Sequence, residues 1–400
     1  MSGTDYKFEG WAAQGKDSTK GKLEFIDYSD EVKPFCEDDV DIKIMYCGIC
    51  AYVHFLATRC WLRHEFVSIL PFPLRDHSAD PSMKFRLAHY VWRLGRYSLP
   101  SRHEIVGEAV RVGSEVKHVK VGDIVGVGAQ NDSCLECGQC KNDREPYCDK
   151  GQTGTYAGEY KRQEKAKGSR SFGGYANYHR APGHFVLKIP DGVDPADAAP
   201  LLCGGVTVYS PLTQYGAGKT AKDVGIVGIG GLGHFGLLWA KALGANVTAI
   251  SHSESKKEDA EKMGATRFIA THSGKEDDFA PYKRSLDLIV CTTNDVNMPM
   301  AGYLSLLKPG GHLVLVGAPE KPLPSLPAFP FLMNNIHLCG SAIGSPAVIR
   351  EMLDLAAEKG VKPWITKRPL EDVNKAVPDM EAGKARYRFV LVNEKNGGKL

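Results

Sequence analysis

The sequence lacks any apolar run long enough to cross a lipid bilayer, and it lacks the apolar core of a secretory signal near its start. Met1–Gly10 is mixed and polar, and the richest apolar stretch, Val224–Leu243, is interrupted by glycines. A membrane-spanning helix needs about 20 consecutive apolar residues, and a signal peptide needs a continuous apolar segment behind a positive start. We therefore expect no membrane partner and a cytoplasmic location.

An excess of charge of either sign is also missing. The 50 Lys and Arg residues nearly balance the 47 Asp and Glu residues, which leaves a formal net charge of +3 without a long basic run. Proteins that bind nucleic acid usually carry a concentrated basic surface, so we expect no nucleic-acid partner. A length of 400 residues, without internal repeats or low-complexity segments, fits a globular protein of two domains.

Cysteines are present in an odd number, eleven, and four of them crowd into one short segment: Cys134, Cys137, Cys140 and Cys148. A reducing compartment keeps thiols free, so clustered cysteines suggest a metal before a disulfide. Four thiolates fill the tetrahedral shell of Zn²⁺ and leave no position for water, which predicts a structural zinc site. An iron–sulfur cluster or disulfide pairing remains an alternative at this point.

The apolar segments change character along the chain. Up to about Pro190, short runs such as Val40–Ile44 and Ile124–Val127 are separated by Gly, Pro and Asp, which predicts irregular β structure. The middle of the chain alternates short buried strands with helical segments. The expected strands there are Val224–Val227, Val247–Ile250, Leu286–Val290 and His312–Val316; the expected helices are Leu232–Leu243 and, further on, Ala347–Glu358. This alternation predicts an α/β fold with a parallel, doubly wound sheet.

A glycine-rich segment lies between the first of these strands and the helix that follows it. It reads Gly228-x-Gly230-Gly231-Leu232-Gly233, which is the Rossmann fingerprint in the strand–turn–helix context that it requires. Glycines there allow a tight turn and a close approach of the backbone to a pyrophosphate at the helix N-terminus. The segment therefore predicts a dinucleotide site.

The end of the second strand indicates which dinucleotide binds. An NAD enzyme places Asp or Glu there to hold the ribose 2′-hydroxyl, but this strand leads into Ser251, Ser253 and Lys256. Hydroxyls and a lysine suit a 2′-phosphate, so we expect NADP(H). Glu254 is expected to face solvent. A solvated helix start without a cofactor role remains the alternative reading of this segment.

Several motifs together resemble the zinc-dependent medium-chain alcohol dehydrogenases, and within them the cinnamyl alcohol dehydrogenase branch. They are Cys47-Gly48-Ile49-Cys50, His103-Glu104-Ile105-Val106-Gly107, the four cysteines, Gly173-Gly174-Tyr175-Ala176, the run from Pro200 to Ser210, Gly228 to His234, Val316-Gly317-Ala318-Pro319 and Arg386-Tyr387-Arg388-Phe389. They span nearly the whole chain in order.

The resemblance implies a Rossmann cofactor domain inserted in a mostly-β, GroES-like catalytic domain. The expected boundaries are residues 1–203 for the catalytic domain, 204–343 for the NADP-binding domain and 344–400 for the return to the catalytic domain. The resemblance also implies a homodimer that transfers hydride between NADPH and an aldehyde or primary alcohol. We expect an aldehyde reductase of broad specificity, with one catalytic and one structural Zn²⁺.

The family's catalytic zinc ligands fall on Cys50, His103 and Cys203, and Glu104 matches a residue that can approach the metal. Two thiolates and an imidazole would leave one position open for a carbonyl oxygen. The family pattern assigns Cys47 to packing. With the glycine-rich segment, the resemblance gives a cofactor site of Thr207, Gly228, Gly230, Gly231, Leu232, Gly233, Ser251, Ser253, Lys256, Val316, Gly317, Ala318, Ser341 and Ile343. Ordinary core packing remains an alternative for Thr207, Val316 and Ile343.

One segment departs from the family. The 52 residues between Cys50 and His103 exceed the family's spacing, with the excess around residues 51–88, and Arg102 stands where the family has Gly. The family's Ser/Thr and Asp after the ligand cysteine are replaced by Tyr52 and Val53. His89, where the pattern resumes, is a candidate for the catalytic relay histidine, with a plain surface or core histidine as the alternative. A catalytically impaired NADP-binding protein with only the structural zinc is the competing functional hypothesis.

Overall fold

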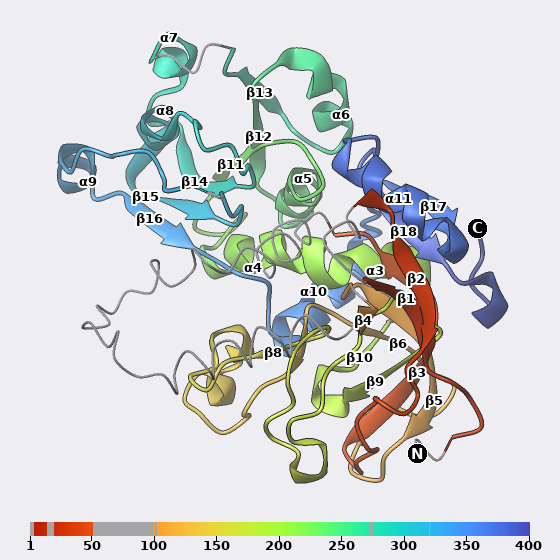
Figure 1. Ribbon diagram of the computed structural model, residues 1–400. Coiled ribbons are helices and arrows are strands. Elements are labelled where there is room, and N and C mark those ends of the chain that lie inside the picture. The colour runs from red at the N-terminus through yellow and green to blue at the C-terminus, as the bar shows by residue number, and fades with distance from the viewer. Residues whose placement is uncertain (1–3, 14–19, 51–98, 101, 273–275, 320) are drawn as a thin grey trace, which may run out of the picture.

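The computed structural model describes residues 4–13, 20–50, 99–100, 102–272, 276–319 and 321–400. Figure 1 shows two bodies side by side, a parallel sheet with its helices and a mostly-β body that contains both ends of the chain. The insertion around 51–88 and His89 lie outside the described residues.

The β body is built from segments far apart in the sequence. Its largest sheet runs in the order β10-β6-β5-β3-β18-β17, and β9 also pairs with β3. The bounds are β3 (Asp39–Gly48), β5 (Ile105–Val112), β6 (Ile124–Val127), β9 (Tyr178–Pro182), β10 (Leu187–Lys188), β17 (Ile365–Pro369) and β18 (Arg388–Val392). Strand β18 pairs antiparallel with β3, with Leu391 opposite Cys47. Strand β18, near the C-terminus, therefore belongs to the same sheet as β3, near the N-terminus.

Two smaller sheets accompany this one. They are β2-β1-β4, with β1 (Glu9–Ala13), β2 (Leu23–Asp27) and β4 (Leu99–Pro100), and β7-β8, with β7 (Gln130–Asp132) and β8 (Thr153–Gly154). The short pair β7-β8 brackets the segment that contains the four clustered cysteines. Helix α11 (Val373–Glu381) packs its apolar face against the body's core through Val373, Ala376 and Val377.

The second body is a six-stranded parallel sheet in the order β13-β12-β11-β14-β15-β16. Its strands are β11 (Asp223–Val227), β12 (Asn246–Ser251), β13 (Arg267–Ala270), β14 (Leu286–Cys291), β15 (Leu307–Leu315) and β16 (His337–Gly340). The four strands and the helix expected in this region from the sequence are present, because continuous β-branched and aliphatic runs flanked by glycine are typical of strands buried on both faces.

Helices cover both faces of the parallel sheet. One face packs on α4 (Val206–Gln214), α5 (Gly233–Ala242) and α6 (Lys257–Lys262), and α10 (Pro346–Lys359) packs against α4 and β10. The other packs on α7 (Glu276–Phe279) and α8 (Met300–Ser305), and α9 (Phe329–Asn334) lies at the amino ends of β15 and β16. Alternate strand residues, such as Ile226 and Val227, enter opposite cores. The observed fold is therefore the expected α/β fold with a doubly wound sheet.

A nearly continuous helical run joins the two bodies. Helix α3 (Pro195–Pro200) passes into a π-helical turn at Leu201–Gly205 and then into α4. The return connection is α10, which Ser345 caps by accepting a hydrogen bond from the Val348 backbone N–H. Within the described ranges, none of the helices combines the length and the apolarity that a bilayer crossing requires.

Candidate active site and metal centres

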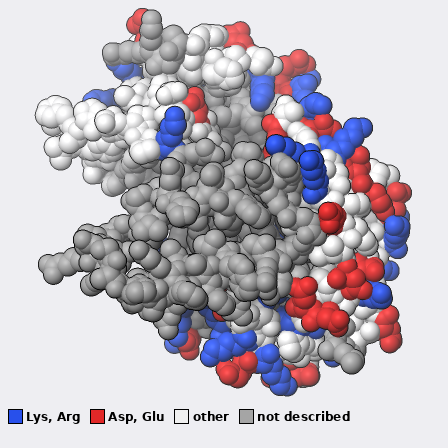
Figure 2. All heavy atoms as spheres, viewed as in Figure 1, with Lys and Arg blue, Asp and Glu red and all other residues white. Residues whose placement is uncertain are grey.

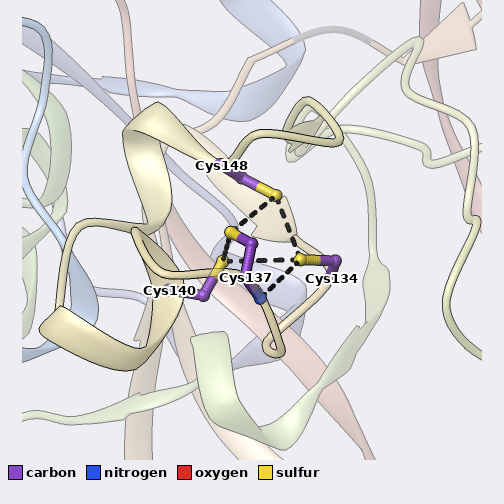
Figure 3. Close-up of side chains that lie close together, drawn as sticks. All are labelled: Cys134, Cys137, Cys140 and Cys148. Atoms are coloured by element: carbon purple, nitrogen blue, oxygen red, sulfur yellow. Dashed lines mark hydrogen bonds between the residues drawn. The ribbon is translucent and has the colours of Figure 1, made fainter.

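The four clustered cysteines converge from a loop without long secondary structure. Figure 3 shows their four sulfur atoms turned toward a common centre. The Sγ–Sγ distances are 3.9 Å for Cys134–Cys140, 3.5 Å for Cys137–Cys140, 4.0 Å for Cys137–Cys148 and 3.4 Å for Cys134–Cys148. Two 3₁₀ turns, Cys140–Asn142 and Glu145–Tyr147, bend the loop back on itself so that residues fourteen positions apart meet.

This spacing fits a mononuclear tetrahedral site. Four thiolates at about 2.3 Å from zinc stand about 3.8 Å from one another. A disulfide would need an Sγ–Sγ distance of about 2.05 Å, and all four thiols are free. An iron–sulfur cluster would place several irons and sulfides between the thiolates and hold them further apart. The N–H groups of Cys140 and Asp149, which point at Cys137, lower the pKa of that thiol to about 6, in favour of the thiolate that a metal requires.

A second cluster of metal-binding side chains joins three parts of the chain. Cys50 follows β3, His103 precedes β5, and Cys203 lies inside the π-helical turn. The Cys50 and Cys203 sulfurs are 3.9 Å apart, and His103 Nε2 lies 3.1 Å from Cys203 Sγ. All are buried, and a Glu104 carboxylate oxygen belongs to the same group of atoms, within 4.8 Å of one another. The π-helical turn at Leu201–Gly205 positions Cys203 in this cluster, and such turns are common at functional sites.

Arg388 forms a buried ion pair with the carboxylate of this cluster. Arg388, at the start of β18, donates from Nη2 to Glu104 Oε1, and both side chains are fully buried. Burial raises the pKa of Glu104, and the Arg388 guanidinium acts in the opposite direction. The hydrogen bond between the Cys203 and Cys50 sulfurs holds the pKa of Cys50 well below its usual value. A thiolate at Cys50 is therefore stabilised even before a cation binds.

Gly48 explains part of the Cys-Gly-Ile-Cys motif. A Cβ atom at residue 48 would stand 1.9 Å from Glu104 Oε2. The carboxylate that meets Arg388 thus occupies the space that any side chain at residue 48 would need. Cys47 packs in the core of the β body and lies outside the second cluster, as the family pattern implies.

The glycine-rich segment forms the turn between β11 and α5. Gly228 has φ +84°, which strongly favours glycine. A Cβ at residue 233 would stand 1.7 Å from the Gly228 carbonyl oxygen, so the helix can begin this close to the strand only with glycine there. Gly231 faces Arg388, whose Nη1 lies 3.3 Å from the position of a Cβ at residue 231. The same arginine therefore contacts the second cysteine cluster and the dinucleotide turn.

The residues expected to choose the dinucleotide lie beside this turn. Ser251 ends β12 and is buried, and the Ser253 hydroxyl lies 2.9 Å from that of Ser255. Lys256 is half-buried, and its Nζ donates to the Ile229 carbonyl oxygen at 2.6 Å. Desolvation lowers the pKa of Lys256. Glu254 is exposed to solvent, as expected. A cation and two hydroxyls thus stand at the edge of the turn.

The remaining predicted cofactor residues lie at the carboxyl ends of β15 and β16 and on α4. Val316 and Gly317 donate their N–H groups to Cys291 O, at 3.0 and 3.2 Å, and Ala318 N–H donates to Asn294 Oδ1 at 2.8 Å. Thr207 Oγ1 donates to Cys203 O at 2.8 Å. Two residues follow β16. Ser341 N–H donates to Leu315 O at 3.0 Å, and Ile343 has φ +44°. In a parallel sheet these carboxyl ends line the ligand crevice.

Comparisons with known proteins agree with this geometry. The family described as alcohol dehydrogenase GroES-like domain matches residues 83–191, and the family described as zinc-binding dehydrogenase matches residues 231–358. The 8-hydroxygeraniol dehydrogenase of Catharanthus roseus is 38% identical over 383 residues, which covers 96% of this chain and 94% of that protein. The chain belongs to the zinc-dependent medium-chain alcohol dehydrogenases, in the cinnamyl alcohol dehydrogenase branch.

Solved structures of this family superpose on nearly the whole chain. A cinnamyl alcohol dehydrogenase from Sorghum bicolor gives a TM-score of 0.78 at 33% identity and covers 98% of this chain and 99% of its own. The CAD from Helicobacter pylori, solved in complex with NADP(H), gives a TM-score of 0.77 at 30% identity and covers 97% of this chain and 99% of its own. These likenesses confirm the family and the fold expected from the sequence motifs.

Three contacts at the cysteine–histidine cluster are not apparent from the sequence of this alcohol dehydrogenase. Tyr156 stacks on the His103 ring, with centroids 5.7 Å apart. Arg102 is buried, and its Nε donates to Tyr175 Oη at 2.7 Å. The third contact is the ion pair of Arg388 with Glu104, since the family motif that contains Arg388 gives it no expected role. Its basic side chain in an otherwise apolar strand is the one signal that points to a buried ion pair.

Proposed function

We propose that this chain reduces aldehydes to primary alcohols, and catalyses the reverse oxidation, by hydride transfer with NADPH and NADP⁺. The observation that carries the proposal is the buried group of Cys50, His103 and Cys203, with the two sulfurs 3.9 Å apart and His103 Nε2 3.1 Å from Cys203 Sγ. Two thiolates and one imidazole are a ligand set that zinc uses in catalysis, since a fourth position stays open. The name of the Catharanthus roseus relative fits this substrate class.

Cys50, His103 and Cys203 would hold the catalytic Zn²⁺. A zinc ion held there supplies a Lewis acid for the carbonyl oxygen of the substrate. Glu104 lies beside the ligands but is paired with Arg388, so its carboxylate neutralises the arginine that reaches the dinucleotide turn. Burial of all four side chains lowers the local dielectric and strengthens these interactions. Cys134, Cys137, Cys140 and Cys148 would hold the structural Zn²⁺.

NADP(H) is the proposed dinucleotide. Gly228–Gly233 would hold the pyrophosphate at the start of α5, and Ser251, Ser253 and Lys256 would hold the 2′-phosphate. Thr207, Val316–Ala318, Ser341 and Ile343 would line the nicotinamide. The complex of the Helicobacter pylori CAD with NADP(H) supports this assignment. The domain boundaries at residues 203/204 and 343/344 belong to the same proposal. The first falls inside the helical run that links the two bodies, and the second precedes α10.

The decisive experiment combines elemental analysis with turnover. We expect two zinc ions per chain and oxidation of NADPH with aromatic or medium aliphatic aldehydes. Cys50→Ser should lose one zinc and its turnover, yet keep NADPH binding. Cys134→Ser should lose the other zinc and lower the thermal stability. A chain with one zinc and no turnover over a broad aldehyde panel would contradict the proposal and favour the impaired NADP-binding protein instead.

We also propose a homodimer formed through the free edge of β16. This strand ends the parallel sheet, and helix α9 beside it exposes Phe329, Leu332 and Met333 by 69%, 76% and 66%. Figure 2 shows mostly uncharged surface over this end of the molecule. A neighbouring cavity of about 210 Å³ is lined mainly by apolar residues such as Leu304, Leu326 and Ile336. Exposed sheet edges and apolar patches of this kind usually contact another chain.

Light scattering after size exclusion tests the dimer. Leu332→Asp should shift the mass from two chains toward one, because it places a charge in the apolar interface. Val121→Asp is the matched control, since Val121 is 62% exposed in the other body. An unchanged mass for Leu332→Asp would contradict an interface at α9. A cytoplasmic location is proposed from the free state of the described cysteines, and fluorescence microscopy of a tagged chain tests it.

A further inference from the structure

The segment between β7 and β8, residues 133–152, contains the four cysteines and is called the four-cysteine lobe. Its tyrosine contacts the segment after β16. Tyr147 lies directly before Cys148, and its Oη accepts a hydrogen bond from the Ala342 backbone N–H at 3.1 Å. These residues are 195 positions apart in the sequence. Ala342 belongs to Ser341–Gly344, which we call the hinge strip because it connects β16 with α10.

The position of Tyr147 is fixed from inside the lobe. Its 3₁₀ turn begins at Glu145, whose side chain is buried and accepts a hydrogen bond from His184 Nε2 at 2.8 Å. Gln130 Nε2 donates to the Glu145 carbonyl oxygen at 3.0 Å, and so does the Cys148 N–H at 3.1 Å. Tyr147 is thus held between a buried anchor on one side and a cysteine of the four-sulfur cluster on the other.

Other contacts also hold the hinge strip, since Ile343 and Gly344 line a small cavity together with Gln130. Ser341 N–H is bound to Leu315 O at the end of β15. Ile343 has φ +44°, in the left-handed region that a β-branched residue rarely adopts. A Cβ at residue 344 would stand 2.3 Å from Val206 Cγ2, so the strip lies close against the start of α4. The bond from Ala342 to Tyr147 therefore supports the strip just before its strained residue.

We propose that Tyr147 is a positioning residue for the nicotinamide site, through which the four-cysteine lobe holds the hinge strip in its binding conformation. This rests on the proposed function, which assigns Ser341 and Ile343 to the nicotinamide. Tyr147 acts through the backbone of Ala342 and touches neither substrate nor metal. Because a preformed site binds its ligand without first paying the entropy of ordering, loss of the phenol oxygen weakens the cofactor complex while the lobe stays folded.

The test compares Tyr147→Phe with Glu136→Gln in the full chain loaded with zinc. Both residues lie in the same lobe, but Glu136 only forms an exposed ion pair with Lys150. One net neutral hydrogen bond corresponds to about a two- to tenfold change in an equilibrium constant. We expect Tyr147→Phe to raise the NADPH dissociation constant by this factor and to speed deuterium exchange at the Ala342 amide. Glu136→Gln should leave both unchanged, and both variants should keep two zinc ions and the wild-type melting temperature.

Three outcomes would overturn the inference. They are unchanged amide exchange, faster exchange with unchanged NADPH affinity, and loss of zinc or of thermal stability in Tyr147→Phe, which would make the residue a support of lobe folding alone. Both readouts are independent of turnover. A wild-type chain that binds NADPH but reduces no aldehyde would refute the proposed reaction, whereas the exchange data would still decide on Tyr147.

Discussion

Lys256 offers the sharpest test of cofactor choice. Its half-buried ammonium donates to the Ile229 carbonyl oxygen inside the glycine-rich turn, 2.6 Å away. Desolvation lowers the pKa of Lys256, so the amine is poorly hydrated and ready to exchange its partner for an anion. Lys257, next in sequence, is exposed at the start of α6. Substitution of either lysine by alanine changes the net charge equally. Lys257→Ala is therefore a control for Lys256→Ala, because only Lys256 contacts the glycine-rich turn.

The size of the effect follows from the two bonds that compete for the ammonium. A hydrogen bond between charged groups contributes about 1.5–3 kcal/mol. Binding of a 2′-phosphate by Lys256 also breaks the bond to Ile229, which costs about 0.5–1.5 kcal/mol. The net contribution is therefore about 1–1.5 kcal/mol, which corresponds to about a five- to twelvefold change in affinity. NADH has no 2′-phosphate, so its affinity should stay unchanged.

The assay is fluorescence titration of NADPH and NADH into the wild type, Lys256→Ala and Lys257→Ala. We expect Lys256→Ala to weaken NADPH alone by the factor above, with a larger loss at low ionic strength, where charges are less screened. Lys257→Ala should weaken NADPH by less than about twofold, as is usual for a solvent-exposed charge. Equal losses for NADPH and NADH in Lys256→Ala would refute the reasoning, and so would equal losses of NADPH in the two variants.

Other perturbations test the core of the site. Arg388→Met should lower the free energy of unfolding by about 3–5 kcal/mol, because it leaves the Glu104 carboxyl buried without its ion-pair partner; urea denaturation measures this, and adding Glu104→Gln should recover part of the loss. Gly48→Ala should displace the Glu104 carboxylate and reduce turnover at least tenfold, whereas Gly138→Ala, with open space around it, should not. His179 is buried neutral with its pKa lowered to about 4. The native state therefore binds fewer protons than the unfolded one, and stability should be constant above about pH 6.5 and fall toward pH 4, by up to about 1.4 kcal/mol per pH unit. His234 is also buried with its pKa lowered, to about 3, and adds to the same slope. His179→Gln should therefore reduce the slope in urea denaturation, and curves parallel to the wild type would contradict the assignment.

Features set by residues near in sequence could be predicted. The four cysteines lie within one loop, and Gly228–Gly233 follows a buried strand and opens a helix. Local spacing and strand–turn–helix order were sufficient for both, because their geometry depends on the backbone of a single segment. The parallel strands β11, β12 and β14 were likewise indicated by the alternation of apolar runs with helices.

Features that depend on contacts between residues far apart in the sequence could not be predicted from local sequence patterns. Nothing in the spacing of Cys50, His103 and Cys203 shows that they meet, since β3 and β5 pair to bring two of them together and a π turn directs the third. Only the family resemblance indicated this set. The bond between Tyr147 and Ala342 and the stacking of Tyr156 on His103 had no signal, because irregular loops carry no periodicity that fixes which side chains face each other.

Arg102 shows how a departure from a family pattern can leave a site assembled. The family has Gly there, and the φ of +87° explains why, since a side chain in this conformation costs about 1–2 kcal/mol. The arginine offsets this cost with two buried hydrogen bonds, from Nε to Tyr175 Oη and from Nη1 to the Cys50 carbonyl oxygen. Its guanidinium thus holds the backbone of one candidate ligand while its own backbone leads directly into another, His103. Arg102, which departs from the family pattern, therefore also links the candidate ligand Cys50 to the candidate ligand His103.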